Sequence, residues 1–339
     1  MDYLKTKLHE LMAIDSPTGF TESATDFVMK ELEDLGYNPI KTLKGGVQCC
    51  LGGEGNPLIF SAHIDTLGGM VCEIKSNGRL KLTKLGGLQP NNIETENCRI
   101  YNRFGKVFTG CFQMNDPSVH VNNDYGTQAR NFDNMEVVPD IVTSSRKETE
   151  TMGISVGDIV CFDPRTVITE SGYIKSRFLD DKLSVVILLQ FAKMLKEENL
   201  KLKRKVYIYV TNYEEVGHGC SSALPEDAVE IVCVDMGCVG SQVQCTEHQV
   251  SICAKDSSGP SDYGVTTALI KAALEAGVDY AVDVYPYYGS DADAALHAGA
   301  NLRHSLIGSG VYASHGYERT HLDGVRNTLS LIKAYTTEK

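Results

Sequence analysis

The sequence predicts an α/β protein with a mostly parallel, three-layer α/β/α sheet and a smaller β-rich domain inserted into it. Apolar runs of strand length alternate with helical patterns after residue 180, which is typical of a parallel sheet covered on both faces by helices. The chain begins with helical and strand patterns too, whereas its middle consists of short β-like pieces between Gly, Asn and Asp clusters. We therefore expect residues 1–67 and 168–339 to form one α/β domain and residues 68–167 to form the inserted domain.

The first 67 residues predict two helices followed by two strands. Apolar residues at helical spacing indicate a helix over Tyr3–Met12 and a second one over about residues 21–35. Residues 37–51 are expected as strand, and the apolar run Pro57–Ala62 as a buried strand.

The inserted segment is expected to be built from short strands without long helices. The β-like pieces are Met70–Ile74, Leu80–Leu85, Ile100–Phe108 and Asp158–Phe162. Residues 115–150 are polar and irregular, and we expect a long loop there.

The last part of the chain alternates between helix and strand. Helices are expected at Lys182–Glu198, Tyr263–Ala276, Ala292–Ala298 and His321–Thr336. Buried strands are expected at Lys205–Thr211 and Ile231–Val234, and Gly308-Ser309-Gly310 is expected as a turn.

The composition excludes several classes of function. Asp plus Glu outnumber Lys plus Arg by 44 to 32, a net charge of −12, which opposes binding to nucleic acid and to anionic membranes. No apolar run reaches the roughly 20 residues that a membrane span needs, and the N-terminus has no signal-peptide pattern. The 11 cysteines include no C-x-x-C pair, so we expect reduced, structural cysteines and a cytoplasmic location.

Acidic and histidine side chains stand at the ends of the predicted strands or at the start of a predicted helix. Because ligands bind at the carboxyl ends of strands in open α/β sheets, these groups are expected to converge. They are His63 and Asp65, Asp180 and Asp181, Glu214 and Glu215, and Asp235. A further candidate is His315, with His297, His304 and His321 as alternatives.

This set fits two divalent metal ions about 3.5–4 Å apart, since zinc accepts imidazole nitrogen and carboxylate oxygen. In one arrangement Asp180 bridges both ions, His63 and Asp235 bind one, and Glu215 and His315 bind the other. Zinc is the expected metal, with cobalt or manganese as alternatives.

Glu214 is left over in that arrangement and is a candidate general base. Neighbouring side chains of extended backbone point to opposite sides, so Glu214 can face the reacting water while Glu215 faces a metal. Taken singly, each motif has a common structural explanation: Asp-Asp before a helix is usually an N-cap, and Glu-Glu after a strand is usually solvated loop. The order of the motifs and their placement at strand ends favour the functional interpretation.

The order of these motifs resembles the dinuclear zinc exopeptidases, and among them the tetrahedral (glutamyl, leucyl and deblocking) aminopeptidases, some of which carry an endoglucanase label. The matching segments are SAHIDTLGGMV (61–71), GDIVCFDPR (157–165), SRFLDDKLSVV (176–186), TNYEEVGHGC (211–220), VDMG (234–237), YGSDADAA (288–295) and SHGYERTHLD (314–323). The position of the inserted domain, between His63 and Asp180, also resembles these aminopeptidases, because deacylase-like and carboxypeptidase-like relatives carry theirs later in the chain.

The resemblance implies a metallo-aminopeptidase that removes N-terminal residues from short peptides. Its implied metal ligands are His63, Asp180, Glu215, Asp235 and His315. It further implies that Glu214 is the general base, that Asp65 orients His63, that the Asp180–Asp181 peptide is cis, and that the chain assembles into a homo-oligomer of twelve subunits.

Three other functions are weighed against this one. A glycoside hydrolase could use Glu214 and Asp235, but the chain has no Trp for a sugar platform, and His63 and His315 stay unexplained. A deacylase or carboxypeptidase of the same clan is disfavoured by the position of the insertion. A non-enzymatic protein on a peptidase scaffold would be expected to lack a ligand or the base, and the chain retains all of them.

Overall fold

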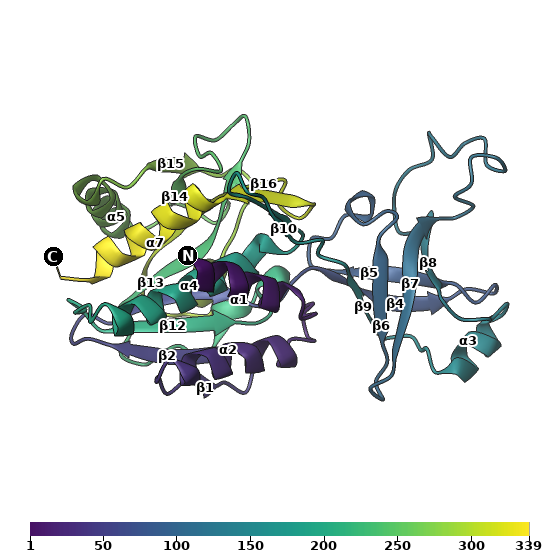
Figure 1. Cartoon of the computed structure of the whole chain (residues 1–339), viewed down its shortest axis with the longest axis horizontal. Helices are drawn as coiled ribbons and strands as arrows, with labels where there is room; N and C mark the ends of the chain where they lie inside the picture. Colours follow the sequence, from purple (N-terminus) through teal and green to yellow (C-terminus); the bar gives the residue numbers. More distant parts are fainter. Residues whose placement is uncertain (339) are drawn as a thin grey trace. The chain divides into compact units, whose positions relative to one another are not determined.

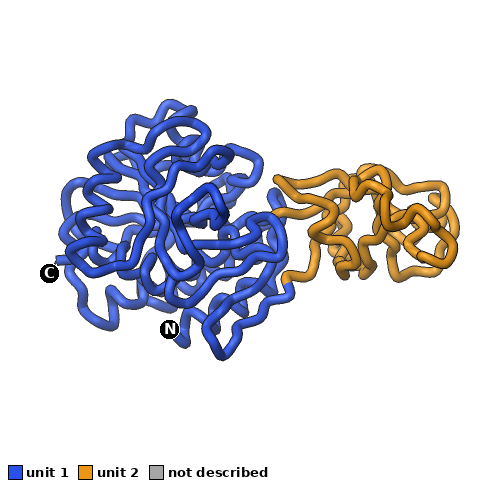
Figure 2. Tube along the Cα trace, turned by 90° about the horizontal axis from the view of Figure 1, so that it is seen from above, with its two compact units in different colours: residues 1–66, 165–339 blue, residues 67–164 orange. Residues whose placement is uncertain are grey.

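The chain divides into two compact units, which Figure 2 shows in different colours. The computed structural model describes residues 1–338. Unit 1 contains residues 1–66 and the chain from residue 165 onward, and unit 2 contains residues 67–164. Each unit has its own sheet and is described by itself.

Unit 1 consists of helices around one large sheet (Figure 1). Its helices are α1 (Asp2–Met12), α2 (Glu22–Asp34), α4 (Leu179–Glu197), α5 (Tyr263–Ala276), α6 (Asp291–His297) and α7 (Leu322–Thr336), with 3-10 turns η2 (Glu214–Val216) and η3 (Gly219–Ser221). Its strands are β1 (Ile40–Lys41), β2 (Val47–Gly52), β3 (Leu58–His63), β10 (Val167–Ile168), β11 (Tyr173–Ser176), β12 (Val206–Thr211), β13 (Glu230–Val239), β14 (Val250–Lys255), β15 (Tyr280–Val284), β16 (Arg303–Tyr312) and β17 (Glu318–His321).

The centre of this eleven-stranded sheet is parallel. Strands β12, β3, β13 and β16 lie side by side in that order and all run in the same direction, while the outer strands are mostly antiparallel. The register of β12 on β3 extends from Val206 opposite Leu58 to Thr211 opposite His63, so both strands end at the same edge. The predicted α/β class is therefore confirmed, with a sheet that is parallel at its centre.

Helices cover the two faces of the sheet unequally. Phe60 of β3 belongs to a buried cluster with residues of α1, α2, α4, α5 and α7, and its ring meets Phe191 of α4 edge-on at 6.4 Å between centroids. The preceding residue, Ile59, points to the other face, where it packs in a cluster with Ala292 and Ala295 of α6. Fully burying one such large side chain stabilises a fold by about 1.5–3 kcal/mol. Many more buried side chains lie on the face covered by five helices than on the α6 face, so most of the stabilisation comes from that face.

The predicted turn at Gly308-Ser309-Gly310 is wrong, because these residues lie in the middle of β16. The glycines are required by backbone contact. A Cβ at Gly308 would collide with the carbonyl oxygen of Asp235, and one at Gly310 with the carbonyl oxygen of Thr246. Here glycine marks close approach of two chain segments inside a sheet.

Unit 2 is a closed β-barrel with the strand order β4-β5-β8-β7-β6-β9. Its elements are β4 (Gly68–Ile74), β5 (Leu80–Leu85), η1 (Pro90–Asn92), β6 (Asn97–Tyr101), β7 (Val107–Met114), β8 (Met135–Pro139), α3 (Arg146–Met152) and β9 (Ile159–Phe162). Pairing of Gly69 with Val160 closes the barrel, and Phe112 meets Phe162 edge-on inside it, 6.0 Å between ring centroids.

The expectation of a single long loop over residues 115–150 is wrong in its second half. Strand β8 lies there because Val137 is buried in the barrel and β8 pairs with β7. Helix α3 begins there too, with Ser145 as N-cap accepting from the Glu148 N–H, and it ends at Gly153 in the left-handed conformation. Among the described residues, no helix is both long and apolar enough to cross a membrane.

Candidate active site

The parallel strands bring the predicted site residues to one edge of the sheet in unit 1. His63 is the last residue of β3, and Glu214 and Glu215 form the η2 turn just after β12. Asp235 lies within β13, which pairs with β3 only as far as Cys233, so it sits where the two strands separate. The sequence had predicted that β13 ends before Asp235, whereas the strand continues to Val239.

His63 lies at the centre of the cluster and is buried. Its Nδ1 is 2.8 Å from the backbone oxygen of Asp65, and since a carbonyl only accepts, Nδ1 carries the proton. Nε2 lies 3.0 Å from Asp180 Oδ1 and 3.5 Å from Glu214 Oε2, so it is the nitrogen that can hold a second proton or bind a cation. Two carboxylates facing this nitrogen make the place between them a position for a cation. Burial lowers the pKa of His63, but Glu214 and Asp180 outweigh that effect and hold it well above its usual value.

Asp180 links the two histidines of the cluster. Its Oδ2 lies 3.5 Å from His315 Nε2, and His315 Nε2 is in turn 3.7 Å from Glu215 Oε2. The peptide bond between Asp180 and Asp181 is cis, as the resemblance implied. Despite burial, which raises it, the pKa of Asp180 is lowered by its contacts with His315 and His63.

Two sets of three potential ligand atoms share His63. One contains Asp180 and Glu215, the other Asp181 and Asp235, and within each set the atoms lie within 4.8 Å of one another. The structure thus brings together all five predicted ligands, and it adds Asp181, whose Oδ2 accepts from the His63 backbone N–H at 3.1 Å.

The carboxylate of Asp65 holds the turn that carries the two glutamates. Its Oδ1 accepts from the Glu214 N–H at 3.1 Å and its Oδ2 from the Glu215 N–H at 3.3 Å. The Thr18 hydroxyl donates to the same Oδ2 at 2.7 Å. Asp65 therefore reaches the His63 ring through its backbone oxygen, and it positions the glutamates through its side chain.

The buried carboxylates exceed the nearby positive charge. Burial, together with neighbouring carboxylates, raises the pKa of Asp235 to about 7 and raises the pKa of Glu214, Glu215 and Asp181 well above their usual values. Two buried oxygens, Glu215 Oε1 and Asp181 Oδ1, have no hydrogen-bond partner. Such an excess of buried carboxylate with unsatisfied oxygens is compensated by metal ions in proteins, and imidazole plus carboxylate is a zinc donor set. The residues present fit divalent cations.

Two buried carboxylates at the site were not predicted. Glu318 accepts from the Asp180 N–H and the His315 N–H, each at 3.0 Å, and burial beside Asp180 raises its pKa to about 8. Asp291 accepts from the Thr211 hydroxyl and from the Cys220 N–H, on either side of the Glu214–Glu215 turn. Both lie in the segments 314–323 and 288–295 singled out above, but only the fold shows what they hold.

The alternative histidines make their contacts away from this cluster. His321 is bonded to the Ser171 oxygen at 2.8 Å and to Asp323, and neither His297 nor His304 joins a candidate metal cluster among the described residues. His315 is the histidine at the site.

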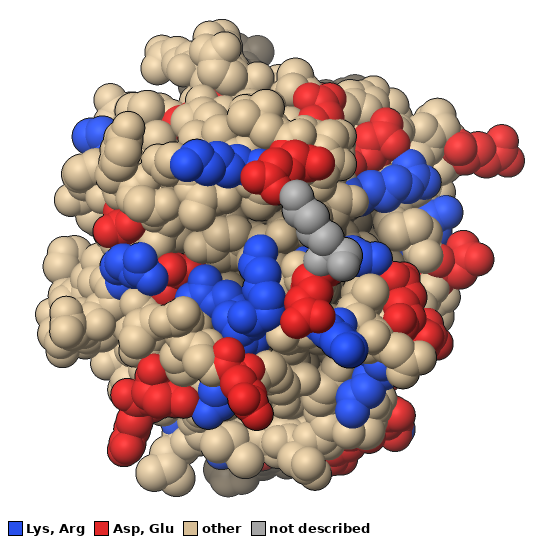
Figure 3. Space-filling model, turned by 90° about the vertical axis from the view of Figure 1, so that its left-hand side faces the viewer, with Lys and Arg blue, Asp and Glu red and all other residues tan. Residues whose placement is uncertain are grey.

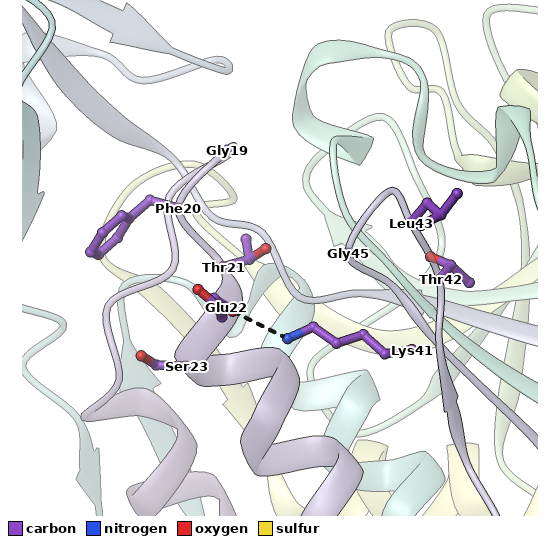
Figure 4. Close-up of a pocket in the computed structure, with 9 residues that line it drawn as sticks. All are labelled: Gly19, Phe20, Thr21, Glu22, Ser23, Lys41, Thr42, Leu43 and Gly45. Carbon is purple, nitrogen blue, oxygen red and sulfur yellow. Dashed lines mark ion pairs between the residues drawn. The ribbon is translucent and has the colours of Figure 1, made fainter. Parts of the chain in front are cut away.

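Two recesses of unit 1 contain none of the predicted site residues. One, of about 390 Å³, lies between the start of α2 and the β1–β2 hairpin, where Lys41 pairs with Glu22 at 3.6 Å (Figure 4). The other lies near the end of α7, on a face where acidic and basic side chains alternate (Figure 3). There Arg204 and Arg303 pair with buried Glu230 at 2.7 and 3.0 Å, so much of their charge is compensated.

Comparison with known proteins identifies the class. A Bacillus subtilis (strain 168) protein named "Putative aminopeptidase YhfE" is 43% identical over 330 residues, which cover 97% of this chain and 95% of that protein. A lysyl aminopeptidase of Pyrococcus furiosus is 26% identical over 192 residues, which cover 57% of this chain and 54% of that protein. The aminopeptidase APDkam598 of the archaeon Desulfurococcus kamchatkensis shares the fold, with a TM-score of 0.87, 22% identity, and coverage of 100% and 95% of the two chains.

The fold and these relatives define a peptide hydrolase, specifically an aminopeptidase. Residues 45–331 match the M42 glutamyl aminopeptidase family, and the chain belongs to that family.

Proposed function

We propose that the chain is a dinuclear metal-dependent aminopeptidase that removes N-terminal residues from short peptides. The observation that carries the metal is the set of buried carboxylates around His63, with Glu215 Oε1 and Asp181 Oδ1 lacking partners. His63 and Asp235 would hold one ion, Glu215 and His315 the other, and Asp180 both. Zinc fits these donors, with cobalt or manganese as alternatives.

The metal ions would supply Lewis acidity, which polarises the scissile carbonyl and makes water a better nucleophile. Glu214 is the group of this chain that moves the proton. Its carboxylate takes a proton from the attacking water and delivers it to the leaving amine, so that the C–N bond breaks with one water added.

The remaining buried acids position these groups. Asp65 fixes the backbone of Glu214 and Glu215 through two N–H groups, and Glu318 does the same for Asp180 and His315. Each of these carboxylates ties two site residues from different segments, so the reacting geometry is set before substrate arrives.

We further propose a catalytic domain of residues 1–67 and 168–339 and an inserted domain of residues 68–167, in keeping with the two compact units. We propose homo-oligomers of twelve subunits. The number is supported by the structure of PhTET1-12s, described as a dodecamer, which has a TM-score of 0.85, 20% identity and coverage of 100% of both chains. The Pyrococcus horikoshii TET1 peptidase, at a TM-score of 0.85, is described as able to assemble into a tetrahedron or a large octahedral shell. A cytoplasmic location is supported by 11 cysteines that are all unpaired.

An activity screen on aminoacyl amides, with chelation and metal add-back, tests the proposal. Activity should vanish on chelation and return with Zn²⁺, Co²⁺ or Mn²⁺, with about two ions bound per active chain at the cluster. Full activity after complete metal removal would overturn the metal assignment and leave the family membership untouched.

A further inference from the structure

A second group of potential ligands lies away from the catalytic cluster, where the β13–β14 loop meets the start of α7. It consists of His248 in that loop, His321 at the end of β17, and Asp323 in the first turn of α7. Asp323 Oδ2 is 3.2 Å from His248 Nδ1 and 3.1 Å from His321 Nδ1. None of the three residues contributes to the site proposed for catalysis.

Hydrogen bonding sets which nitrogen of His321 can bind an ion. Its Nε2 is 2.8 Å from the Ser171 carbonyl oxygen, which only accepts, so Nε2 carries the proton and Nδ1 presents its lone pair. Nδ1 accepts the Asp323 N–H at 3.1 Å, as the N-cap of α7, and lies 3.1 Å from Asp323 Oδ2, so an ion bound there would replace that hydrogen bond. A backbone carbonyl behind a histidine in this manner is the usual support of a metal-binding imidazole.

The spacing matches a coordination sphere. Ligands at about 2.0–2.1 Å from a tetrahedral zinc ion lie roughly 3.3–3.4 Å from each other. Asp323 Oδ2 lies 3.1 Å from one histidine nitrogen and 3.2 Å from the other, close to that value, and all three ligand atoms lie within 4.8 Å of one another. The rings of His248 and His321 are already held together, with centroids 4.2 Å apart and Tyr173 against both.

The surroundings orient the carboxylate toward the histidines. Arg326 donates to Asp323 Oδ1 at 2.7 Å, which leaves Oδ2 for the histidine side. A further hydrogen bond joins the β13–β14 loop to α7: the Asn327 side chain donates to the His248 carbonyl oxygen at 2.9 Å. An ion here would tie the β13–β14 loop to the first turn of α7.

We propose that His248, His321 and Asp323 form a zinc site with two imidazole ligands and one carboxylate ligand, separate from the catalytic centre. Two nitrogens and one carboxylate oxygen are a donor set that Zn²⁺ accepts, with water completing the tetrahedron.

The first test counts zinc in the full-length chain after dialysis against dilute Zn²⁺. The variants Asp323→Asn and His248→Gln should each hold one zinc ion fewer than the unmodified chain and keep its aminopeptidase turnover. The control variant His120→Gln, changed at an exposed histidine of unit 2, should hold the full number. Equal zinc content in all four proteins would overturn the site and leave a histidine–aspartate ion pair only.

A second measurement is spectroscopic and does not depend on activity. Each catalytic ion is proposed to have one histidine ligand, whereas the surface site has two. With Cu²⁺ as probe, electron paramagnetic resonance of the unmodified chain should include a centre coupled to two imidazole nitrogens, which Asp323→Asn weakens. A spectrum with only one-nitrogen centres would contradict the proposal, whatever the activity screen gives.

Discussion

Two clusters in unit 1 have the same residue types at similar spacing but lie in opposite surroundings. In the catalytic cluster, His63 and Asp181 are 2% and 1% exposed. In the surface cluster, the side chains of His248 and Asp323 are 43% and 46% exposed. The pKa of Asp181 is raised, mainly by burial, while that of Asp323 is lowered by His248 and its other partners.

This difference shows what burial adds to a set of ligands. Water and Arg326 stabilise the charge of Asp323, so the surface cluster is stable with or without an ion. The catalytic cluster has no such compensation: oxygens of Glu215 and Asp181 are buried without partners. A bound cation should therefore stabilise the catalytic cluster strongly and the surface cluster weakly.

The largest expected effect separates the base from the ligands within the buried cluster. Glu214→Gln keeps the shape of the side chain but removes the proton acceptor, so turnover should fall by about 10²–10⁴-fold with metal content unchanged. Glu215→Gln should lose metal first. Kinetics and metal analysis of both variants check this, with exposed Glu226→Gln as control. Equal metal loss in the two variants would mean that the roles are not separate.

The next effect is a change with pH in the free energy of unfolding of the metal-free protein. Burial raises the pKa of Asp235 from 3.8 to about 7 and that of Glu318 from 4.5 to about 8. The folded chain then binds more protons than the unfolded chain above pH 4, so its free energy of unfolding should fall as the pH rises from about 4 to about 8. His63 and His315, whose pKa is also raised, act in the same direction.

The expected loss is roughly 4 kcal/mol for each of these two carboxyl groups, since one pKa unit is equivalent to about 1.4 kcal/mol. Denaturant unfolding of the chelated protein at several pH values measures it, and the zinc-loaded protein is the control, with a much flatter profile. Parallel profiles with and without zinc would show that no cation compensates these carboxylates.

A smaller effect is expected from the residue that positions the glutamates. Asp65→Ala removes the acceptor for the Glu214 and Glu215 N–H groups, so the turn loses its anchor. Loss of such a supporting group typically costs about 10–100-fold in activity or metal affinity. Turnover and KM should be measured with a short peptide, and Asp65→Asn, which retains an acceptor, should recover part of kcat. Unchanged turnover in Asp65→Ala would remove this role.

The sequence predicted the parts of unit 1 in which local pattern and tertiary packing agree. Strand β3 and helix α5 lie where an apolar run and helical spacing placed them, because β3 is buried along its whole length and α5 buries one face that includes Val265 and Leu269. The convergence of His63, Asp180, Glu215, Asp235 and His315 was foreseen from strand ends and from the order of motifs.

What the sequence did not predict depends on contacts between distant segments. Gly308 and Gly310 lie inside strand β16, where the backbone of another segment comes too close for a side chain. From the local sequence alone, such a pair of glycines predicts a turn. Glu318 and Asp291 lie in segments that the sequence analysis singled out, but their roles were not predicted, because each accepts hydrogen bonds from backbone far along the chain. The pair of His248 and His321 was missed for the same reason: 73 residues separate them.

The smallest predicted effect concerns the charge of Arg326 beside the surface cluster. Arg326 lies 2.7 Å from Asp323 Oδ1, and its charge repels an ion bound on the other oxygen. Both side chains are about half exposed, so the repulsion is screened by water and amounts to less than about 1 kcal/mol, a few-fold in affinity. Arg326→Gln should therefore bind zinc a few-fold more tightly at the surface cluster, with turnover unchanged. Zinc titration at low and high salt measures the difference, which should shrink as salt rises, and Lys193→Gln on α4 is the control. Weaker zinc binding in Arg326→Gln would mean that the arginine acts by holding the carboxylate in place and not by its charge.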